Sequence, residues 1–295
     1  MFEKFRLNSA LIEYKKRFEE IWPDEKYKWA AVKCFQDNWD INADDFADML
    51  AKAFAETANL LTSYNYYPAG MIMEFAKINK EEVRAMFIEL FDETKDVYER
   101  IDSCKQKSNI LLEKYGNGAS QHYQYENAIS TYLWLRYPDK YYIYKLGEVK
   151  AVSNELESTF VFKKGAYADN IRNFFTFYNE ICEELIKDEG LVKLFKSQDL
   201  SNCYPDPKLK TLTIDVGFFI SRRLHDGEIG TNEWFPVEYT PALTVDDWEV
   251  LLNDNEVFTS SSLEIMKRML GYGGQATCTQ LSIKYGESKN FYNSG

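Results

Sequence analysis

The sequence predicts a mainly α-helical protein: a multi-helical N-terminal domain followed by a truncated helix-turn-helix unit of the winged-helix type. Three observations predict this class. Apolar residues recur at three- and four-residue steps along most of the chain, which is the spacing of one face of an α-helix. Gly, Pro and Asn-Gly breaks separate these segments at helix length. Residues 259–295 repeat the pattern on a smaller scale, with serines before one short helix and glycines after it.

Composition excludes several classes of protein. The chain is 45% hydrophobic and 16% aromatic, which is incompatible with a disordered protein. No apolar run reaches the roughly eighteen residues of a transmembrane helix, and the acidic N-terminus lacks the apolar core of a signal peptide. The five cysteines are widely spaced and form no metal-binding pair, which indicates reduced thiols in a cytoplasmic protein.

The first half of the chain reads as a series of helices. Apolar spacing predicts helices over residues 1–21, 27–37, 44–61, 71–77, 81–115 and 125–137. Pro23 is expected to end the first of them and Pro138 the last, because proline cannot continue a helix. Gly116 and the residues after it break the long helix.

The second half begins with an ambiguous segment. Residues 140–145, KYYIYK, are aromatic and β-branched, which favours either a short strand or an extended link. Helices are expected again at residues 147–157, 168–188 and 190–196. Residues 209–224 carry a continuous apolar run that fits a strand or a buried helix, and we favour the helix. Residues 225–242 lack apolar periodicity and hold Gly and Pro signals, so they are the predicted linker.

The predicted domains are therefore a helical domain over residues 1–224, with a candidate sub-boundary near residue 145, and a helix-turn-helix unit over residues 243–295. This unit begins with a helix over 245–252 after Thr244. Its next helix follows the N-capping serines Ser260, Ser261 and Ser262 and runs to Leu270, and a shorter one covers 277–285. The helix expected after Ser288 has only a few residues, so we interpret the chain as the front part of a longer protein.

The sequence holds no motif of a catalytic or cofactor-binding site. The patterns GxxxxGK[ST], GxGxxG and GxSxG do not occur, so neither a phosphate cradle nor a nucleophile elbow is expected. The two histidines, His122 and His225, lie in different regions, whereas a histidine-based metal site or dyad needs them together. We therefore expect no enzyme activity, no cofactor and no metal in this chain.

The C-terminal unit is the candidate DNA-binding part. In a DNA-binding helix-turn-helix the start of the last helix enters the major groove. The candidate contacts are Lys284 on phosphate and Ser288, Lys289, Asn290, Tyr292 and Asn293 on bases. Residues 259–295 hold four basic and two acidic residues, a net charge of +2, while the total of −12 leaves −14 for the rest. The alternative is that the unit packs between domains or binds protein.

A second candidate site is a group of aromatic residues between positions 130 and 145. Trp134, Tyr137, Tyr141 and Tyr142 could stack on a flipped or unpaired base. The same spacing also places such rings in a helical core, with the tyrosine hydroxyls hydrogen-bonded at its edge. We favour the core.

Five stretches of the sequence resemble one family. They are residues 28–54 (KWAAVKCFQDNWDINADDFADMLAKAF), 59–76 (NLLTSYNYYPAGMIMEFA), 128–145 (AISTYLWLRYPDKYYIYK), 203–222 (CYPDPKLKTLTIDVGFFISR) and 243–295. Together they look like the N-terminal region of large bacterial McrB-like AAA+ proteins, the nucleotide-hydrolysing subunits of restriction systems that cut modified DNA.

The resemblance implies a recognition or regulatory role in anti-phage defence. In such a parent protein an AAA+ motor follows this region, and a partner nuclease cuts the DNA. The family's nucleotide-binding residues match no position in this chain. The resemblance thus implies DNA, modified or plain, as the partner of the C-terminal unit. Because the rest of the chain is acidic, a second hypothesis stays open: the chain is a protein-interaction or regulatory scaffold that does not bind DNA.

Overall fold

A computed structural model describes residues 1–62, 66–225, 244–254, 257–271 and 278–286. The chain divides into two compact units, residues 1–228 and residues 229–295. Every regular element among the described residues is a helix. The predicted mainly α class is therefore confirmed.

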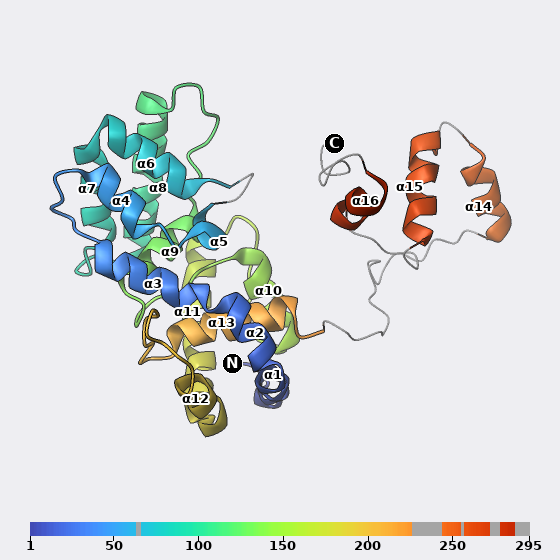
Figure 1. The fold of residues 1–295 in the computed structure, drawn as a ribbon, viewed down its shortest axis with the longest axis horizontal. Coiled ribbons are helices and arrows are strands. Elements are labelled where there is room, and N and C mark those ends of the chain that lie inside the picture. Colours follow the sequence, from blue (N-terminus) through green and yellow to red (C-terminus); the bar gives the residue numbers. More distant parts are fainter. Residues whose placement is uncertain (63–65, 226–243, 255–256, 272–277, 287–295) are drawn as a thin grey trace. The chain divides into compact units, whose positions relative to one another are not determined.

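The first unit consists of helices joined by connections of one to thirteen residues (Figure 1). In chain order they are α1 (Lys4–Lys16), α2 (Phe18–Glu25), α3 (Tyr27–Asn38), α4 (Phe46–Ala53), α5 (Ala58–Leu61), α6 (Pro68–Ile78), α7 (Lys80–Leu90), α8 (Val97–Tyr115), α9 (Glu126–Arg136), α10 (Leu146–Glu155), α11 (Tyr167–Lys187), α12 (Glu189–Lys196) and α13 (Lys210–Arg222). The predicted helices that became α3, α9, α11 and α12 have ends within two residues of the expected ones.

Two central helices, α9 and α13, hold the first unit together. Both are buried along most of their length, and α13 contacts α1, α10 and α11. The indole nitrogen of Trp134 on α9 donates a hydrogen bond to Thr211 Oγ1 on α13 at 3.1 Å. A helix that is apolar on every side is stable where other elements cover every side. The helix predicted over residues 209–224 is confirmed for this reason.

The single long helix predicted over residues 81–115 is wrong, because α7 ends at Leu90 and α8 begins at Val97. The buried Arg100 donates to the carbonyl oxygen of Leu90 at 2.6 Å, which satisfies an acceptor at the end of α7. Asp96 accepts from two backbone N–H groups in the first turn of α8 and caps it. Both broken ends are thus satisfied, and α7 and α8 can pack against each other.

Two other predicted helices are also split. Residues 1–21 form parts of α1 and α2, which meet at Arg17, and Pro23 lies inside α2 instead of ending it. Residues 44–61 form α4 and α5, and the hydroxyl of Thr57 between them donates to the carbonyl oxygen three residues earlier at 2.8 Å. Both breaks are short, and the apolar residues on the two sides of each break keep the spacing of one helix. The apolar spacing therefore could not reveal the breaks.

Residues 140–145 cross the first unit as an extended link, the second of the two alternatives, and no strand forms there. The backbone N–H of Tyr144 donates to Ser130 Oγ at 2.9 Å, and its carbonyl oxygen accepts from Asn127 Nδ2 at 3.0 Å. Side chains of α9 therefore satisfy the backbone that a neighbouring strand would otherwise pair. The first unit continues through residue 145 without a division.

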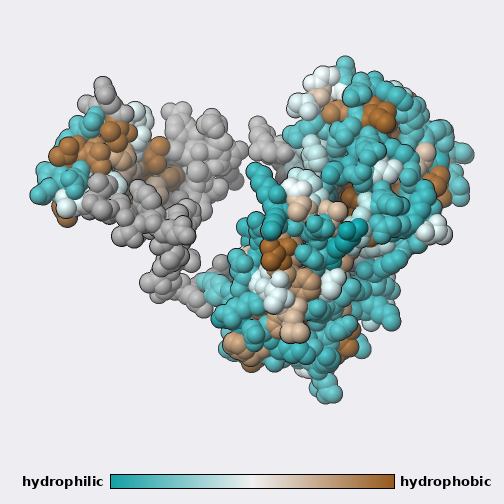
Figure 2. All heavy atoms as spheres, turned by 180° about the vertical axis from the view of Figure 1, so that it is seen from behind, coloured by the Kyte–Doolittle hydropathy of each residue, from teal (hydrophilic) through white to brown (hydrophobic). Residues whose placement is uncertain are grey.

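The second unit contains the three helices expected before residue 286. They are α14 (Val245–Leu252), α15 (Ser260–Leu270) and α16 (Cys278–Tyr285). Thr244 caps α14 in a reciprocal capping box with Asp247. Thr259, and not the serines after it, caps α15, since its Oγ1 accepts from the N–H of Ser262 at 3.2 Å. Neither α14 nor α15 has a buried residue, and apolar side chains are visible on the unit's surface (Figure 2).

Candidate functional site

The two helices predicted to begin the helix-turn-helix, α15 and α16, contact each other. A Cβ atom added to Gly271 would lie 3.0 Å from the hydroxyl oxygen of Tyr285, so this ring of α16 lies against the end of α15. The guanidinium of Arg268 on α15 lies 5.3 Å from the centre of the same ring. Leu281 and Ser282 of α16 are buried. The two helices are thus in contact through the Tyr285 ring.

The predicted DNA contacts are only in part within the described structure. Lys284 lies on α16 with its side chain exposed, and its ammonium is 5.2 Å from the centre of the Tyr285 ring. Lys267 on α15 is also exposed. The other five predicted contacts, Ser288, Lys289, Asn290, Tyr292 and Asn293, lie outside the described residues. Their role on bases therefore stays a prediction.

The aromatic residues proposed for base stacking lie in the core of the first unit. Trp134, Tyr141 and Tyr142 are buried. Tyr137 is half-buried and donates its hydroxyl to the carbonyl oxygen of Phe91 at 2.7 Å. The rings pack against other rings, as Tyr142 does in edge-to-face contacts with its aromatic neighbours. Their faces are not open to a base, so the structure does not support the stacking role, and the core placement that we favoured is found.

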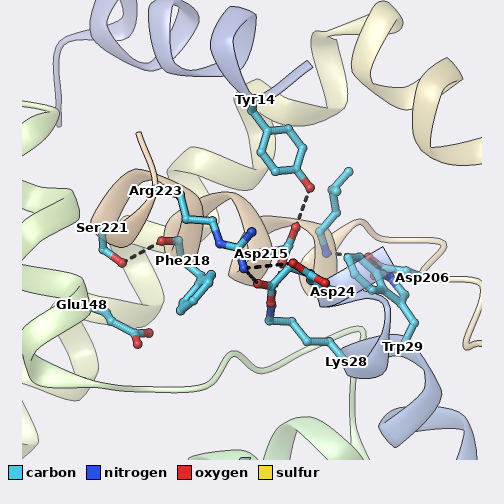
Figure 3. Close-up of polar contacts among 12 residues, drawn as sticks. Tyr14, Asp24, Lys28, Trp29, Glu148, Asp206, Asp215, Phe218, Ser221 and Arg223 are labelled. Carbon is cyan, nitrogen blue, oxygen red and sulfur yellow. Dashed lines mark hydrogen bonds and ion pairs between the residues drawn. The ribbon is translucent and has the colours of Figure 1, made fainter. Parts of the chain in front are cut away.

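A cluster of charged side chains and one tyrosine, buried except at Arg223, joins α1, α2, α3 and α13 (Figure 3). Lys28 Nζ lies 2.7 Å from Asp215 Oδ1 and also pairs with Glu25. The hydroxyl of Tyr14 donates to Asp215 Oδ2 at 2.6 Å. Arg223 Nη2 lies 2.9 Å from Glu25 Oε1. We call these five residues the buried charge cluster.

The charges in this cluster favour a structural role over a catalytic one. Burial alone would lower the pKa of Lys28, but the carboxylates of Asp215 and Glu25 outweigh burial and raise it. Burial, followed by the charge of Asp215, raises the pKa of Tyr14. A proton-transferring lysine needs a lowered pKa instead. The side chains of Lys28 and Asp215 are 3% and 1% exposed, so a substrate cannot reach them.

A second buried carboxylate, Asp206, holds the start of α13. It accepts hydrogen bonds from the backbone N–H groups of Thr211 and Leu212 at 3.2 and 2.8 Å, and from the indole of Trp29 at 3.3 Å. Burial raises the pKa of Asp206 to about 6, although the three N–H donors oppose that rise. This residue ties the loop before α13 to α3.

The sequence patterns did not predict the buried charge cluster. One signal was present, because Asp215 interrupts the apolar run LTIDVGFFI and a carboxylate in such a run must find a partner. Nothing in the sequence identifies that partner as Lys28, which is 187 positions away. The contact exists because α3 and α13 meet in the folded protein.

In the described parts of the chain, no three His, Cys, Asp or Glu side chains come together as a metal site would require. The two histidines are apart: His122 Nε2 lies 3.1 Å from Asn109 Oδ1, and His225 Nε2 lies 3.1 Å from Glu155 Oε2. None of the described helices is long and apolar enough to span a bilayer.

Comparison of the chain with protein-family models, curated proteins and solved structures finds no match.

Proposed function

We propose that this chain is the recognition and regulatory region of a McrB-like restriction protein and that residues 243–295 contribute to binding of its DNA target in anti-phage defence. The observation that supports this proposal is the contact between α15 and α16, two short helices that lie where the sequence predicts the first two helices of a helix-turn-helix. The two helices expose Lys267 and Lys284, which suit contacts to phosphate.

The acidic remainder of the chain supports a division of labour. It carries a net charge of −14 outside residues 259–295, and such a surface repels the DNA backbone. DNA contact would therefore be confined to residues 259–295, because residues 243–258 hold five acidic residues and no basic one, and the first unit would regulate or position it. In the parent protein an AAA+ motor and a partner nuclease would supply the nucleotide hydrolysis and the cut. This chain would need no cofactor or metal of its own.

Fluorescence anisotropy with labelled duplexes tests DNA binding. Plain and cytosine-modified duplexes are titrated with the chain at low and moderate salt, and the salt dependence of the affinity counts the phosphate contacts. Lys284→Ala should weaken binding to all duplexes alike and reduce the salt slope by about 1. Lys52→Ala is the matched control, because Lys52 is an exposed lysine on α4 of the first unit and should leave binding unchanged.

The outcomes distinguish DNA binding by the C-terminal unit from non-specific binding and from no binding. Binding that depends on Lys284 and not on Lys52 supports the C-terminal unit as the DNA contact. Equal losses in the two variants would show that any binding is non-specific. Absence of binding to every duplex at low salt, in the parent protein as well as in this chain, would refute the proposal.

One observation favours a second candidate, a protein-interaction scaffold. Apolar side chains on the second unit are strongly exposed, with 82% of Val245, 71% of Val250 and 71% of Leu270 accessible (Figure 2). Exposed apolar patches often mark protein contacts. If this candidate is correct, the double variant Val245→Asp, Val250→Asp should no longer capture a partner subunit from infected cells, whereas the wild-type chain should. Neither the wild-type chain nor the variant should raise the anisotropy of the labelled duplex above the value of free DNA.

A further inference from the structure

The first helix of the second unit, α14, leaves its apolar side chains uncovered. Five of its eight residues are apolar, and none of them is buried. Val245 is 82% exposed, Val250 71% and Trp248 38%, and apolar side chains are visible on this unit in Figure 2. A helix of this length is not stable alone in water. Cover over its apolar side chains would stabilise α14, and exposed apolar surface of this kind is typical of a docking site.

The spacing of these side chains divides them between two sides of α14. Val245, Trp248 and Leu252 follow one another at steps of three and four residues, which places them along one side of a helix. Val250 lies about 140° around the helix from Val245, since each residue turns an α-helix by about 100°. We call Val245, Trp248 and Leu252 the α14 face, and Val250 lies outside it.

The charge beside the α14 face is negative. Asp246 and Glu249 are exposed, and neither forms an ion pair with any described residue. Asp247, between them, caps the helix. Residues 243–258 as a whole hold five acidic residues and no basic one. An uncovered apolar face bordered by carboxylates is complementary to a partner that is both apolar and positively charged.

This charge selects the class of partner. Nucleic acids and anionic membranes are negatively charged, so the carboxylates of α14 would repel them. A second copy of this chain would bring a net charge of −12 and is disfavoured for the same reason. A helix with one apolar and one basic side would gain apolar contact with the face and attraction to the carboxylates together.

We propose that the α14 face is a docking site for a basic amphipathic helix of another protein. The apolar side of that helix would cover Val245, Trp248 and Leu252, and its lysine or arginine side chains would lie beside Asp246 and Glu249. The proposal rests on the second candidate function, protein interaction by the second unit, and names the chemistry of the partner. DNA contact by residues 259–295 is a separate property.

Tryptophan fluorescence of the 295-residue chain tests the docking, because the partly exposed Trp248 lies in the proposed contact. The probe is a tryptophan-free peptide of about eighteen leucines and lysines, long enough to form a helix, with its leucines at helical spacing. Covering the indole with apolar side chains should shift its emission to shorter wavelength, and Trp248→Phe should abolish the shift.

Two control peptides separate charge from amphipathicity. One has glutamate in place of every lysine, and the other has the same composition as the probe in an order without helical spacing. The probe should bind at least about tenfold more tightly than either control. Like charges across an interface cost several kcal/mol, and a tenfold change in affinity corresponds to about 1.4 kcal/mol.

Two valines of α14 provide a matched pair of variants. Val245→Ser removes apolar surface from the α14 face and should weaken binding of the probe about tenfold. Val250→Ser makes the same chemical change on the other side of the same helix and should keep the wild-type affinity. Because the two substitutions have the same intrinsic effect on helix stability, a difference between them cannot come from unfolding of α14.

A matched pair of double variants tests the charge. Asp246→Asn with Glu249→Gln removes two negative charges, leaves the capping residues in place, and should weaken binding of the probe and reduce its salt dependence. Glu19→Gln with Glu183→Gln removes two exposed carboxylates of the first unit and should leave binding unchanged.

Four results would overturn the proposal. They are equal affinity for the lysine and glutamate peptides, equal losses in Val245→Ser and Val250→Ser, equal losses in the two charge variants, and no emission shift at millimolar peptide. Capture of a partner from infected cells by a chain that does not bind the probe would refute this proposal and leave the scaffold candidate standing. Absence of DNA binding in the anisotropy experiment would leave this proposal intact, so the failures can be told apart.

Discussion

Replacing Lys28 by Met would remove the one cation that contacts Asp215 within 4 Å among the described residues. Methionine keeps much of the side-chain volume, so packing changes little. Asp215 would retain the Tyr14 hydroxyl, and Glu25 would retain Arg223. Breaking a buried ion pair by removing one partner costs about 3–5 kcal/mol. Since a typical domain is stable by about 5–15 kcal/mol, the variant should lose a large share of its free energy of unfolding.

Urea unfolding followed by tryptophan fluorescence measures this loss, because Trp22 and Trp29 lie beside the cluster on α2 and α3. Lys33→Met is the matched control on the same helix. Lys33 pairs with Asp37 at 2.8 Å, but both side chains are more than a third exposed, so the control should cost less than about 0.5 kcal/mol. Similar losses in the two variants would refute the reasoning.

A second substitution identifies the cause. Adding Asp215→Asn removes the charge that Lys28→Met leaves without its cation, so it should recover part of the stability at neutral pH. A double variant less stable than Lys28→Met alone would show that the loss comes from packing and not from an unpaired charge.

Two further predictions concern stability. Gly217→Ala should lower the free energy of unfolding by about 1–3 kcal/mol, because its Cβ would lie 2.4 Å from the hydroxyl oxygen of the buried Tyr178. A Cβ on Gly147 of α10 would meet nothing within 4 Å, so Gly147→Ala should stabilise the protein by up to about 1 kcal/mol. Equal effects of the two substitutions in urea unfolding would contradict this. For Asp206, the raised folded pKa of about 6 means that its contribution is fully present below the unfolded value near 4 and is lost as the pH rises through 6. Relative to wild type, Asp206→Asn should therefore gain about 2 kcal/mol between pH 4 and pH 7, and a difference in stability that is constant with pH would argue against a buried titrating carboxylate.

Apolar spacing predicted the helices well where a helix runs unbroken. α3, α9 and α11 follow the expected ranges, because the spacing of buried side chains reports directly which face of a helix is covered. The same spacing failed at the junction of α7 and α8. A break of a few residues keeps the apolar positions in step, and its stability depends on Arg100 reaching the carbonyl oxygen of Leu90.

The candidate sites were less predictable than the fold. Whether an aromatic ring such as Trp134 is open to a ligand or buried in the core depends on the residues around it. For Trp134 these include Thr211 of α13, which lies 77 positions further along the chain. The DNA contacts predicted beyond α16 stay predictions.

The sequence by itself determined the mainly helical class, the buried nature of α13 and the position of the short helices α14 to α16, because each follows from local spacing and capping residues. Only the tertiary structure decided where helices break, which aromatic rings are covered and which carboxylates receive a cation. Asp215 shows the reason. Its place in an apolar run indicates that it needs a partner, but Lys28 becomes that partner only when α3 packs beside α13.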